Sequence, residues 1–176
     1  MRIIAGSHKG KKLQTFQGDE IRPTSDRARE SLFNILNTSV RDCSFLDLCS
    51  GTGAVGIEAY SRGAGKVTFV DVRRESMNLT KRNANSVGLQ GEFCVCSAVA
   101  FLTTTTSTYD IIFFDPPYAF DGLLDVLRVV KERKLLNDGG VFIYERTAQN
   151  ESVTAQGFTL YDSRKYGIAV FDFYKE

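Results

Sequence analysis

The chain has 176 residues, of which 43% are hydrophobic, enough to build one continuous core, and this excludes a disordered chain. Its 22 basic and 21 acidic residues give a net charge of +1, so the overall charge does not indicate a polyanionic partner. The charge is unevenly distributed, because residues 1–18 hold no acid but four basic side chains: Arg2, Lys9, Lys11 and Lys12. We therefore predict a single domain over residues 1–176, with residues 1–41 as a basic N-terminal extension.

Several classes of protein are disfavoured by what the sequence lacks. No apolar run approaches the roughly 20 residues that cross a bilayer, and residues 1–6 are too short for a signal peptide. We expect a cytoplasmic protein without a membrane partner, acting as a monomer. Four cysteines and one histidine without a C-x-x-C pair predict reduced thiols and no metal site.

Two elements are expected ahead of the core. Residues 2–16 have apolar ends around two glycines, which predicts a hairpin with basic residues at its tip. A helix is predicted over Asp26–Asn37, after Pro23 and an N-cap supplied by Thr24 or Ser25. Its apolar and charged side chains are expected on opposite faces: Ala28, Leu32, Ile35 and Leu36 against Arg27, Arg29 and Glu30.

After residue 43, short apolar runs alternate with segments of helical period, which is typical of βαβ units. The expected strands cover residues 44–48, 67–70, 93–96, 110–114 and 141–144. The expected helices cover residues 54–62, 73–87, a short segment near 99, and 123–132. The chain ends with strand-like segments 158–165 and 168–174, which predict an antiparallel pair at one edge of the sheet.

A glycine-rich turn follows the first strand of this core. Gly51, Gly53 and Gly56 form a G-x-G-x-x-G pattern at the start of a helix, where glycines permit a tight turn and close approach of a ligand. Together with the preceding Ser50, this turn predicts a site for a nucleotide-type cofactor. Asp71 strengthens the prediction, because it ends the second strand, where a carboxylate can accept both ribose hydroxyl hydrogens.

Asp47 distinguishes two classes of cofactor that fit this turn. A carboxylate at the end of the first strand repels the pyrophosphate of a dinucleotide, whereas it attracts an ammonium or sulfonium group. S-adenosylmethionine carries both cations. Residues 46–53 also resemble the first motif of class I S-adenosylmethionine-dependent methyltransferases. The resemblance implies an α/β, Rossmann-like fold whose mostly parallel seven-stranded sheet ends in an antiparallel hairpin, with S-adenosylhomocysteine as the product.

The tetrapeptide Asp115-Pro116-Pro117-Tyr118 follows the fourth expected strand, at the carboxyl edge where ligands bind in such folds. An exocyclic amino nitrogen of a base is a poor nucleophile, because its lone pair is conjugated into the ring. The Asp115 carboxylate and the Pro116 carbonyl can accept its hydrogens and turn the lone pair toward the methyl carbon. The two prolines restrict the turn, and Tyr118 offers a face for an unstacked base. We predict these four residues as the catalytic motif.

The segment Arg22–Asn34 completes a pattern that runs nearly from end to end of the chain. Its Arg-Pro-Thr-x-x-Arg-x-Arg-Glu signature, with the glycine turn and the tetrapeptide, resembles the bacterial 16S ribosomal RNA guanine-N2 methyltransferase family of the RsmD type. The resemblance implies methyl transfer to N2 of one guanine in the small-subunit RNA, within an assembled or partly assembled particle. It also implies that Arg22 and Thr24 lie beside the methionine end of the cofactor.

The basic N-terminal region is assigned to RNA binding by this resemblance. The expected contacts to RNA are His8, Lys9, Lys11, Lys12, Arg27 and Arg29. His8 is interpreted as an RNA contact or a surface residue, not as a catalyst.

The adenine end of the cofactor site departs from the family pattern. Relatives usually carry Asp or Asn near the end of the third strand, whereas this chain has Ser97-Ala98. We expect Ser97 and Ala98 to occupy this position, where Ser97 can accept one hydrogen bond.

Other functions are compatible with parts of the pattern. A DNA adenine-N6 or cytosine-N4 methylase uses the same tetrapeptide chemistry, but normally carries a target-recognition segment for which 176 residues leave no room. An NAD-dependent oxidoreductase could use the glycine turn, but His8 is too far in sequence from the sheet edge to relay a proton there. A non-catalytic RNA-binding module would not need an intact tetrapeptide. The tetrapeptide alone does not specify the base, since Asp115 can accept from guanine, adenine or cytosine amino groups.

Overall fold

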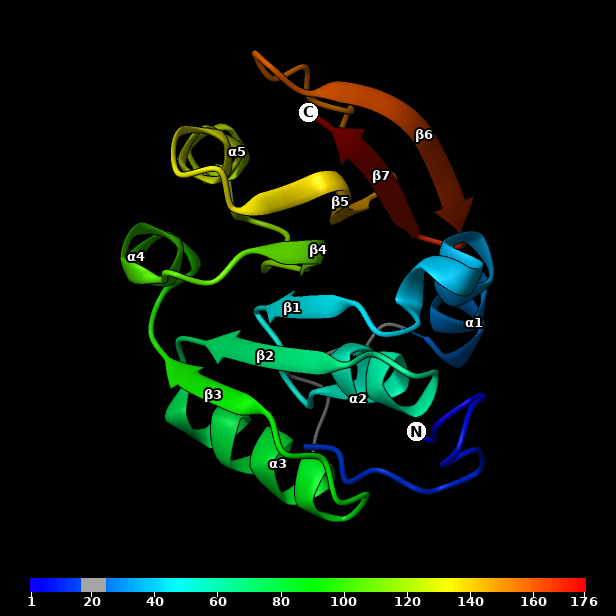
Figure 1. Ribbon diagram of the computed structural model, residues 1–176. Coiled ribbons are helices and arrows are strands. Elements are labelled where there is room, and N and C mark those ends of the chain that lie inside the picture. The colour runs from blue at the N-terminus through cyan, green and yellow to red at the C-terminus, as the bar shows by residue number, and fades with distance from the viewer. Residues whose placement is uncertain (17–24) are drawn as a thin grey trace.

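The computed structural model describes residues 1–16 and 25–176, and within these residues seven strands form one sheet with helices on both faces (Figure 1). The strands are β1 (Ser44–Leu48), β2 (Lys66–Asp71), β3 (Glu92–Val95), β4 (Tyr109–Phe114), β5 (Leu136–Thr147), β6 (Thr159–Tyr166) and β7 (Ala169–Lys175). The helices are α1 (Asp26–Leu36), α2 (Ala54–Ser61), α3 (Arg74–Asn85), α4 (Ala98–Thr104) and α5 (Leu123–Glu132), with a 3-10 segment η1 (Asn37–Val40). None of the helices in the described residues is long and apolar enough to span a bilayer.

The sheet has the order β3-β2-β1-β4-β5-β7-β6. β1 to β5 pair in parallel, whereas β7 is antiparallel to both β5 and β6. This arrangement confirms the expected α/β fold with a mostly parallel sheet and an antiparallel C-terminal hairpin. The segment Ile111–Phe114 of β4 is buried throughout, as a parallel strand covered on both faces must be.

β5 is longer than expected, because it begins at Leu136 rather than at Val141. Its register against β4 shifts between Tyr109, which lies opposite Leu136, and Ile111, which lies opposite Val141. The stretch between Leu136 and Val141 includes Gly139, with a φ of +76°. Since glycine and polar residues are rare in regular strands, the sequence of this irregular stretch conceals the start of the strand.

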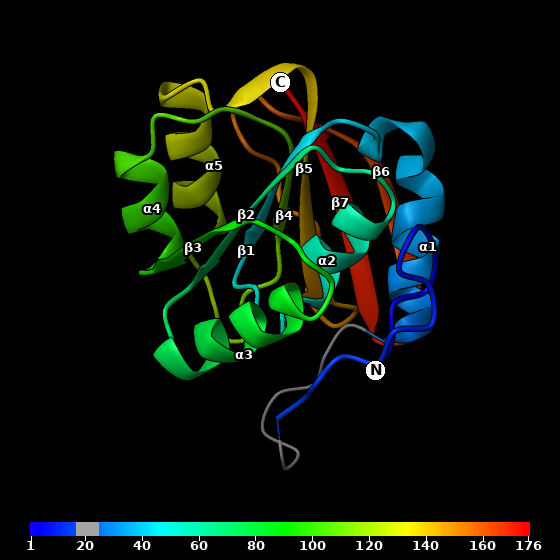
Figure 2. The same ribbon diagram turned by 60° about the horizontal axis from the view of Figure 1, so that its bottom comes forward.

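The sheet separates two apolar cores. The first lies between the sheet and helices α1, α2 and α3, and the second between the sheet and helices α4 and α5 (Figures 1 and 2). In β1, Phe45 packs in the first core, while Leu46 and Leu48 pack in the second. Because β1 has a partner on each side, its carboxyl end lies in the middle of the sheet edge.

The basic arm, residues 1–16, is a loose hairpin rather than a pair of regular strands. An isolated antiparallel bridge joins Arg2 to Lys12. Ile3 and Leu13 are buried in the first core together with side chains of α1 and α2. Apolar packing therefore attaches the arm to the body of the protein.

Helix α1 begins at the expected residue. The Ser25 hydroxyl accepts a hydrogen bond from the Ala28 N–H at 3.1 Å, so Ser25 is the N-cap. Thr24, the other candidate for this cap, lies outside the described residues. The helix ends one residue earlier than expected, at Leu36, because the chain continues as η1.

The prediction that Arg29 lies on the solvent-facing side of α1 is wrong. Its side chain is 0% exposed, and its guanidinium lies 3.0 Å from the Asp26 carboxylate and 3.7 Å from the Glu58 carboxylate. It also donates to the Arg2 carbonyl. The arm and α2 cover this face of α1. Arg29 Nη2 donates to Asp26 and to the Arg2 carbonyl, whereas Nε and Nη1 have no hydrogen-bond partner among the described residues. Arg29 therefore cannot contact RNA in this structure.

Candidate active site

The glycine turn joins β1 to α2 at the carboxyl edge of the sheet. Gly51 and Gly53 have φ values of +56° and +77°, in the left-handed region that side chains rarely adopt. A Cβ on Gly53 would lie 2.7 Å from Thr80 Cγ2, and a Cβ on Gly56 would lie 2.4 Å from Phe69 Cε1. The first two glycines therefore shape the turn, and the third allows α2 to pack closely against β2.

Asp71, at the end of β2, is hydrogen-bonded to this turn. Its Oδ2 accepts from the Gly51 N–H at 2.9 Å, and its Oδ1 accepts from the Arg73 N–H at 2.8 Å. Each carboxylate oxygen has two lone pairs, so these bonds leave capacity for further acceptance. The position beside the turn is compatible with the predicted ribose contact.

Asp47 lies beneath the turn, with a side chain that is 2% exposed. Its Oδ2 accepts from the Gly56 N–H at 2.9 Å, which joins β1 to the first turn of α2. Burial raises the pKa of Asp47 to about 7; the hydrogen bond from Gly56 opposes this shift, and the charge of Asp71 adds to it.

Three carboxylates converge where β1 ends. Burial, followed by the charges of Asp71, Asp115 and Asp47, raises the pKa of the Cys49 thiol to about 12. These acids are far apart in the sequence, and the topology of the sheet brings them to one place. The charges of Asp71 and Asp115, joined by that of Asp47 when it is ionised, favour a cationic ligand over a pyrophosphate.

The tetrapeptide lies at the same edge, at the end of β4. The Asp115 N–H donates to the Leu48 carbonyl at 3.3 Å, so the tetrapeptide begins directly beside the end of β1. The Phe120 N–H donates to the Pro117 carbonyl at 2.8 Å and closes the turn. Tyr118 is 49% exposed, which leaves its ring accessible to an incoming base.

Ser97 and Ala98 lie at the start of α4, next to the end of β2. The Cys96 N–H donates to the Asp71 carbonyl at 3.1 Å, which sets the distance between the two strand ends. The Ser97 hydroxyl is the N-cap of α4 and accepts from the Ala100 N–H at 3.2 Å. A hydroxyl oxygen has two lone pairs, so one acceptor position remains for an adenine amino group.

The residues at this edge fit S-adenosylmethionine. The Ser50 hydroxyl oxygen is buried in the turn and has no hydrogen-bond partner among the described residues, so a ligand would satisfy it. The open turn, the Asp71 carboxylate and the surrounding negative charge match the amino acid, ribose and cationic parts of the cofactor respectively.

Helix α3 supports the turn through two side chains that the sequence did not single out. The Thr80 hydroxyl donates to the Gly51 carbonyl at 3.0 Å, and Asn83 Nδ2 donates to the Thr52 carbonyl at 2.9 Å. Asn83 also accepts from the Gln14 N–H at 2.8 Å and donates to the Gln14 carbonyl at 3.0 Å. Thr80 and Asn83 are three residues apart on one helix face, and only the fold shows that this face meets the turn.

The arm is attached to α2 by Glu58, which is fully buried. Its carboxylate accepts from the N–H groups of Ile4 at 2.8 Å and Ala5 at 3.0 Å. It also lies 2.7 Å from Arg62 Nε and 3.7 Å from Arg29 Nε. Glu58 is the only charged residue in the helix Ala54–Ser61, which is otherwise mostly apolar. This isolated charge is the sequence signal that indicates a buried acid with partners.

The expected RNA contacts differ in their exposure. Those that are exposed are Lys9, Lys11, Lys12 and Arg27. His8 is half-buried, and its ring stacks on Tyr60 with 5.6 Å between ring centroids. Arg22 and Thr24, the expected contacts to the methionine end of the cofactor, lie outside the described residues.

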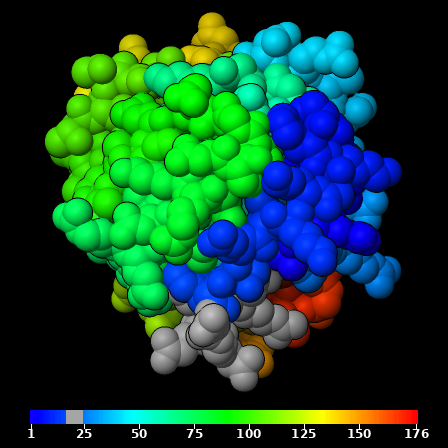
Figure 3. Space-filling model, turned by 90° about the horizontal axis from the view of Figure 1, so that it is seen from below, coloured from blue at the N-terminus to red at the C-terminus, as the bar shows by residue number. Residues whose placement is uncertain are grey.

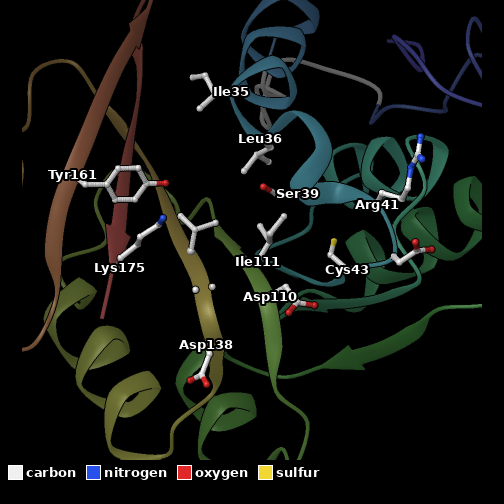
Figure 4. A pocket seen from close by; sticks show the side chains of 14 residues that line it. Ile35, Leu36, Ser39, Arg41, Cys43, Asp110, Ile111, Asp138, Tyr161 and Lys175 are labelled. Carbon is white, nitrogen blue, oxygen red and sulfur yellow. The ribbon is translucent and has the colours of Figure 1, made fainter.

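A pocket of about 410 Å³ lies at the opposite end of the sheet (Figure 4). Side chains of α1 and η1 line one side of it, and Tyr161 and Lys175 line the other. Cys43 precedes β1 and Asp110 lies near the start of β4, so the pocket is at the amino ends of strands whose carboxyl ends bear the turn and the tetrapeptide. The described residues contain no cluster of three or more His, Cys, Asp or Glu side chains that could hold a metal ion.

The fold and the carboxyl edge together define a class I S-adenosylmethionine-dependent methyltransferase. The family model described as Conserved hypothetical protein 95 matches residues 1–175. The chain belongs to this family, the RsmD-type methyltransferases that its sequence resembles.

Known proteins similar to this chain carry a consistent description. The Ribosomal RNA small subunit methyltransferase D of Haemophilus influenzae is 31% identical over 99% of this chain and 93% of its own length. The protein of the same name from Escherichia coli K12 is 32% identical over 85% of this chain and 76% of its own length. A solved Escherichia coli structure described as a methyltransferase is 30% identical, with a TM-score of 0.86, over 99% of this chain and 96% of that one.

Proposed function

We propose that this protein transfers a methyl group from S-adenosylmethionine to the N2 amino group of one guanine in the 16S ribosomal RNA of the small ribosomal subunit. The observation that carries methyl transfer to an amino group is the hydrogen bond between the Asp115 N–H and the Leu48 carbonyl, which puts the tetrapeptide beside the glycine turn. The choice of guanine N2 rests on membership of the family. The names of the relatives support ribosomal RNA of the small subunit as the substrate.

The proposed chemistry needs the amino group and the cofactor to lie on the same sheet edge. When bound, the cofactor supplies a methyl group on a positively charged sulfur, which is a good leaving group. The Asp115 carboxylate and the Pro116 carbonyl accept the two amino hydrogens and direct the nitrogen lone pair at the methyl carbon. The Asp115 charge also offsets the positive charge that develops on the nitrogen before its proton is lost.

Base and RNA binding are assigned to separate surfaces. Tyr118 provides a stacking face for a base that has left its helix, with stacking worth roughly 1 to 3 kcal/mol. The exposed lysines of the arm contact phosphates: Lys9, Lys11 and Lys12. Apolar packing and Glu58 attach the arm to the body that bears the site, so its phosphate contacts set the orientation of the RNA.

Methylation of purified substrates tests this function. Small-subunit particles, protein-free 16S RNA and duplex DNA, all from a strain lacking the protein, are incubated with labelled S-adenosylmethionine and the enzyme. We expect one N2-methylguanosine per 16S RNA, formed most rapidly on particles. Label in adenine, in cytosine or in DNA would contradict the assignment, and a reaction without enzyme is the control.

A further inference from the structure

The exposed face of α3 is rich in cations that the proposed function has not used. Arg74, Lys81 and Arg82 are all exposed, and Arg74 and Arg82 are separated by about 12 Å at the rise of 1.5 Å per residue in an α-helix. Asn78 and Asn85 are exposed on the same face and add amide donors between and beyond them.

This face of α3 is continuous with the basic arm. Arg82 Nε donates to the Gln14 side-chain carbonyl at 3.3 Å, and the Arg73 guanidinium lies 5.7 Å from the centroid of the Phe16 ring. The hydrogen bonds between Asn83 and Gln14 join the same two segments. Figure 3 shows the arm and α3 side by side on one face of the molecule.

The charge of the joined surface is strongly positive in an almost neutral protein. Residues 1–16 and 73–85 contain eight Lys and Arg residues but one acid, Glu75, whereas the whole chain has a net charge of +1. Glu75 pairs with Arg73 at 3.3 Å, at the amino end of the helix. On β3, the strand next to α3, the acid is Glu92, at the first residue of the strand.

Helix α5 provides a contrast within the same protein. There Arg128 pairs with Asp125 at 3.3 Å and with Glu132 at 3.2 Å, so the exposed charges of α5 largely compensate one another. The stripe formed by Arg74, Lys81 and Arg82 has no such acid among residues 76–85. A polyanion is therefore attracted to α3 and not to α5.

The direction of α3 connects this charge to the active site. Arg74 begins the helix three residues after Asp71, at the edge where the cofactor is expected to bind. Arg82 lies at the other end of the stripe, beside the arm. An RNA strand that contacts the arm can follow the stripe toward the sheet edge that bears the tetrapeptide.

We propose that the exposed face of α3 formed by Arg74, Lys81 and Arg82 binds phosphates of the RNA substrate and extends the surface of the basic arm. This inference rests on the proposed function, because it assumes that the substrate is RNA. It adds a second phosphate-binding element. The RNA then contacts both the basic arm and α3, which meet at Gln14.

A triple variant tests the inference. Arg74→Gln, Lys81→Gln and Arg82→Gln are combined, and the matched control combines Lys131→Gln, Arg133→Gln and Lys134→Gln, which remove the same charge from exposed positions at the end of α5. Binding to small-subunit particles and to protein-free 16S RNA is measured between 50 and 200 mM salt. Methylation rates, S-adenosylhomocysteine affinity and unfolding midpoints are measured in parallel.

We expect the α3 variant to bind particles and protein-free RNA at least roughly tenfold more weakly at 50 mM salt, with the slope of log affinity against log salt reduced by about 2. The KM for particles should rise while kcat, the cofactor affinity and the unfolding midpoint remain at wild-type values. The control should bind as the wild type does.

Three outcomes would overturn the inference. The first is a slope of log affinity against log salt that is the same in the α3 triple variant as in the wild type, when the wild type methylates particles normally. The second is an equal loss in the control, which would mean that only net charge matters. The third is a loss on particles but not on protein-free RNA, which would assign α3 to a ribosomal protein. If the wild type itself fails to methylate small-subunit RNA, the proposed function falls, and this inference falls with it.

Discussion

Asp47, Asp71 and Asp115 meet at the end of β1 but have different environments. Asp47 is buried beneath the turn and has a raised pKa. Asp71 is bound by two backbone N–H groups at the end of β2. Asp115 is half-buried at the end of β4. We therefore expect Asp47 to support the turn rather than to contact the cofactor directly, and we keep Asp71 as the proposed ribose ligand and Asp115 as the proposed catalytic residue.

Substitution of Asp115 separates chemistry from binding. Because its contacts to the amino group are proposed to strengthen in the transition state, Asp115→Ala should lower the rate of single-turnover methyl transfer far more than it weakens RNA or cofactor binding. Asp115→Asn keeps an acceptor oxygen and should retain more activity than Ala, unless the full charge is needed. Near-normal turnover of Asp115→Ala on particles would return the tetrapeptide to the role of a structural turn.

The raised pKa of Asp47 makes stability depend on pH. The pKa of Asp47 is about 7 in the folded protein against an ordinary 3.8, so the folded state keeps a proton that the unfolded state has lost. The contribution of Asp47 to stability therefore falls as the pH rises from about 4 to 7. Asp47→Asn can still accept from the Gly56 N–H but does not ionise. Its stability relative to wild type should increase between pH 5 and 7 and level off above, as measured by urea unfolding; a constant difference would refute the assignment.

At the scale of elements, the arm, α1 and α2 form one unit through buried charge. Glu58 of α2 binds two backbone N–H groups of the arm and neutralises Arg29 of α1. Gly6 lies against the end of α2, where a Cβ would come within 1.7 Å of the Ser61 carbonyl oxygen. The position of the basic arm, which is proposed to bind RNA, thus depends on buried residues of α1 and α2.

Glu58→Gln should detach the arm and weaken the fold. The variant removes one of the two carboxylates beside the buried Arg29 guanidinium and directs an amide donor at backbone donors, so the free energy of unfolding should fall by about 3 kcal/mol. Glu132→Gln, which removes an exposed partner of Arg128, is the control and should leave the free energy of unfolding nearly unchanged, because solvent screens this pair. Chemical denaturation compares the two, and protease sensitivity within residues 1–16 reports the arm; equal losses would contradict the role of Glu58.

The extent to which sequence predicts this site depends on whether the information is local. The glycine turn and the tetrapeptide are contiguous patterns at strand ends, so their meeting follows from the βαβ topology. The sequence does not predict the burial of Arg29, because that burial depends on Glu58 and on Arg2, which lie in other elements. The support from Thr80 and Asn83 was missed for the same reason, since these residues are typical of any polar helix face.

For the whole molecule, the cofactor should act as a stabiliser, because it joins elements from both faces of the sheet. S-adenosylhomocysteine at 100 times its Kd should add about 2.7 kcal/mol to the free energy of unfolding and raise the thermal midpoint, whereas NAD should leave the midpoint unchanged. Asp71→Ala should reduce the shift at a given ligand concentration through weaker ribose binding, without altering the secondary structure. A midpoint raised by NAD would contradict the cofactor assignment.

The central position of β1 also governs the slowest motions of this protein. Its backbone pairs with β2 on one side and β4 on the other, and its apolar side chains enter both cores. Its amide hydrogens should therefore exchange with solvent deuterium only when the whole domain opens, more slowly than those of the edge strands β3 and β6. β1, which lies beneath the cofactor site, would then stay folded during every partial opening. The amide hydrogens of the arm and of the tetrapeptide loop would exchange faster than those of β1.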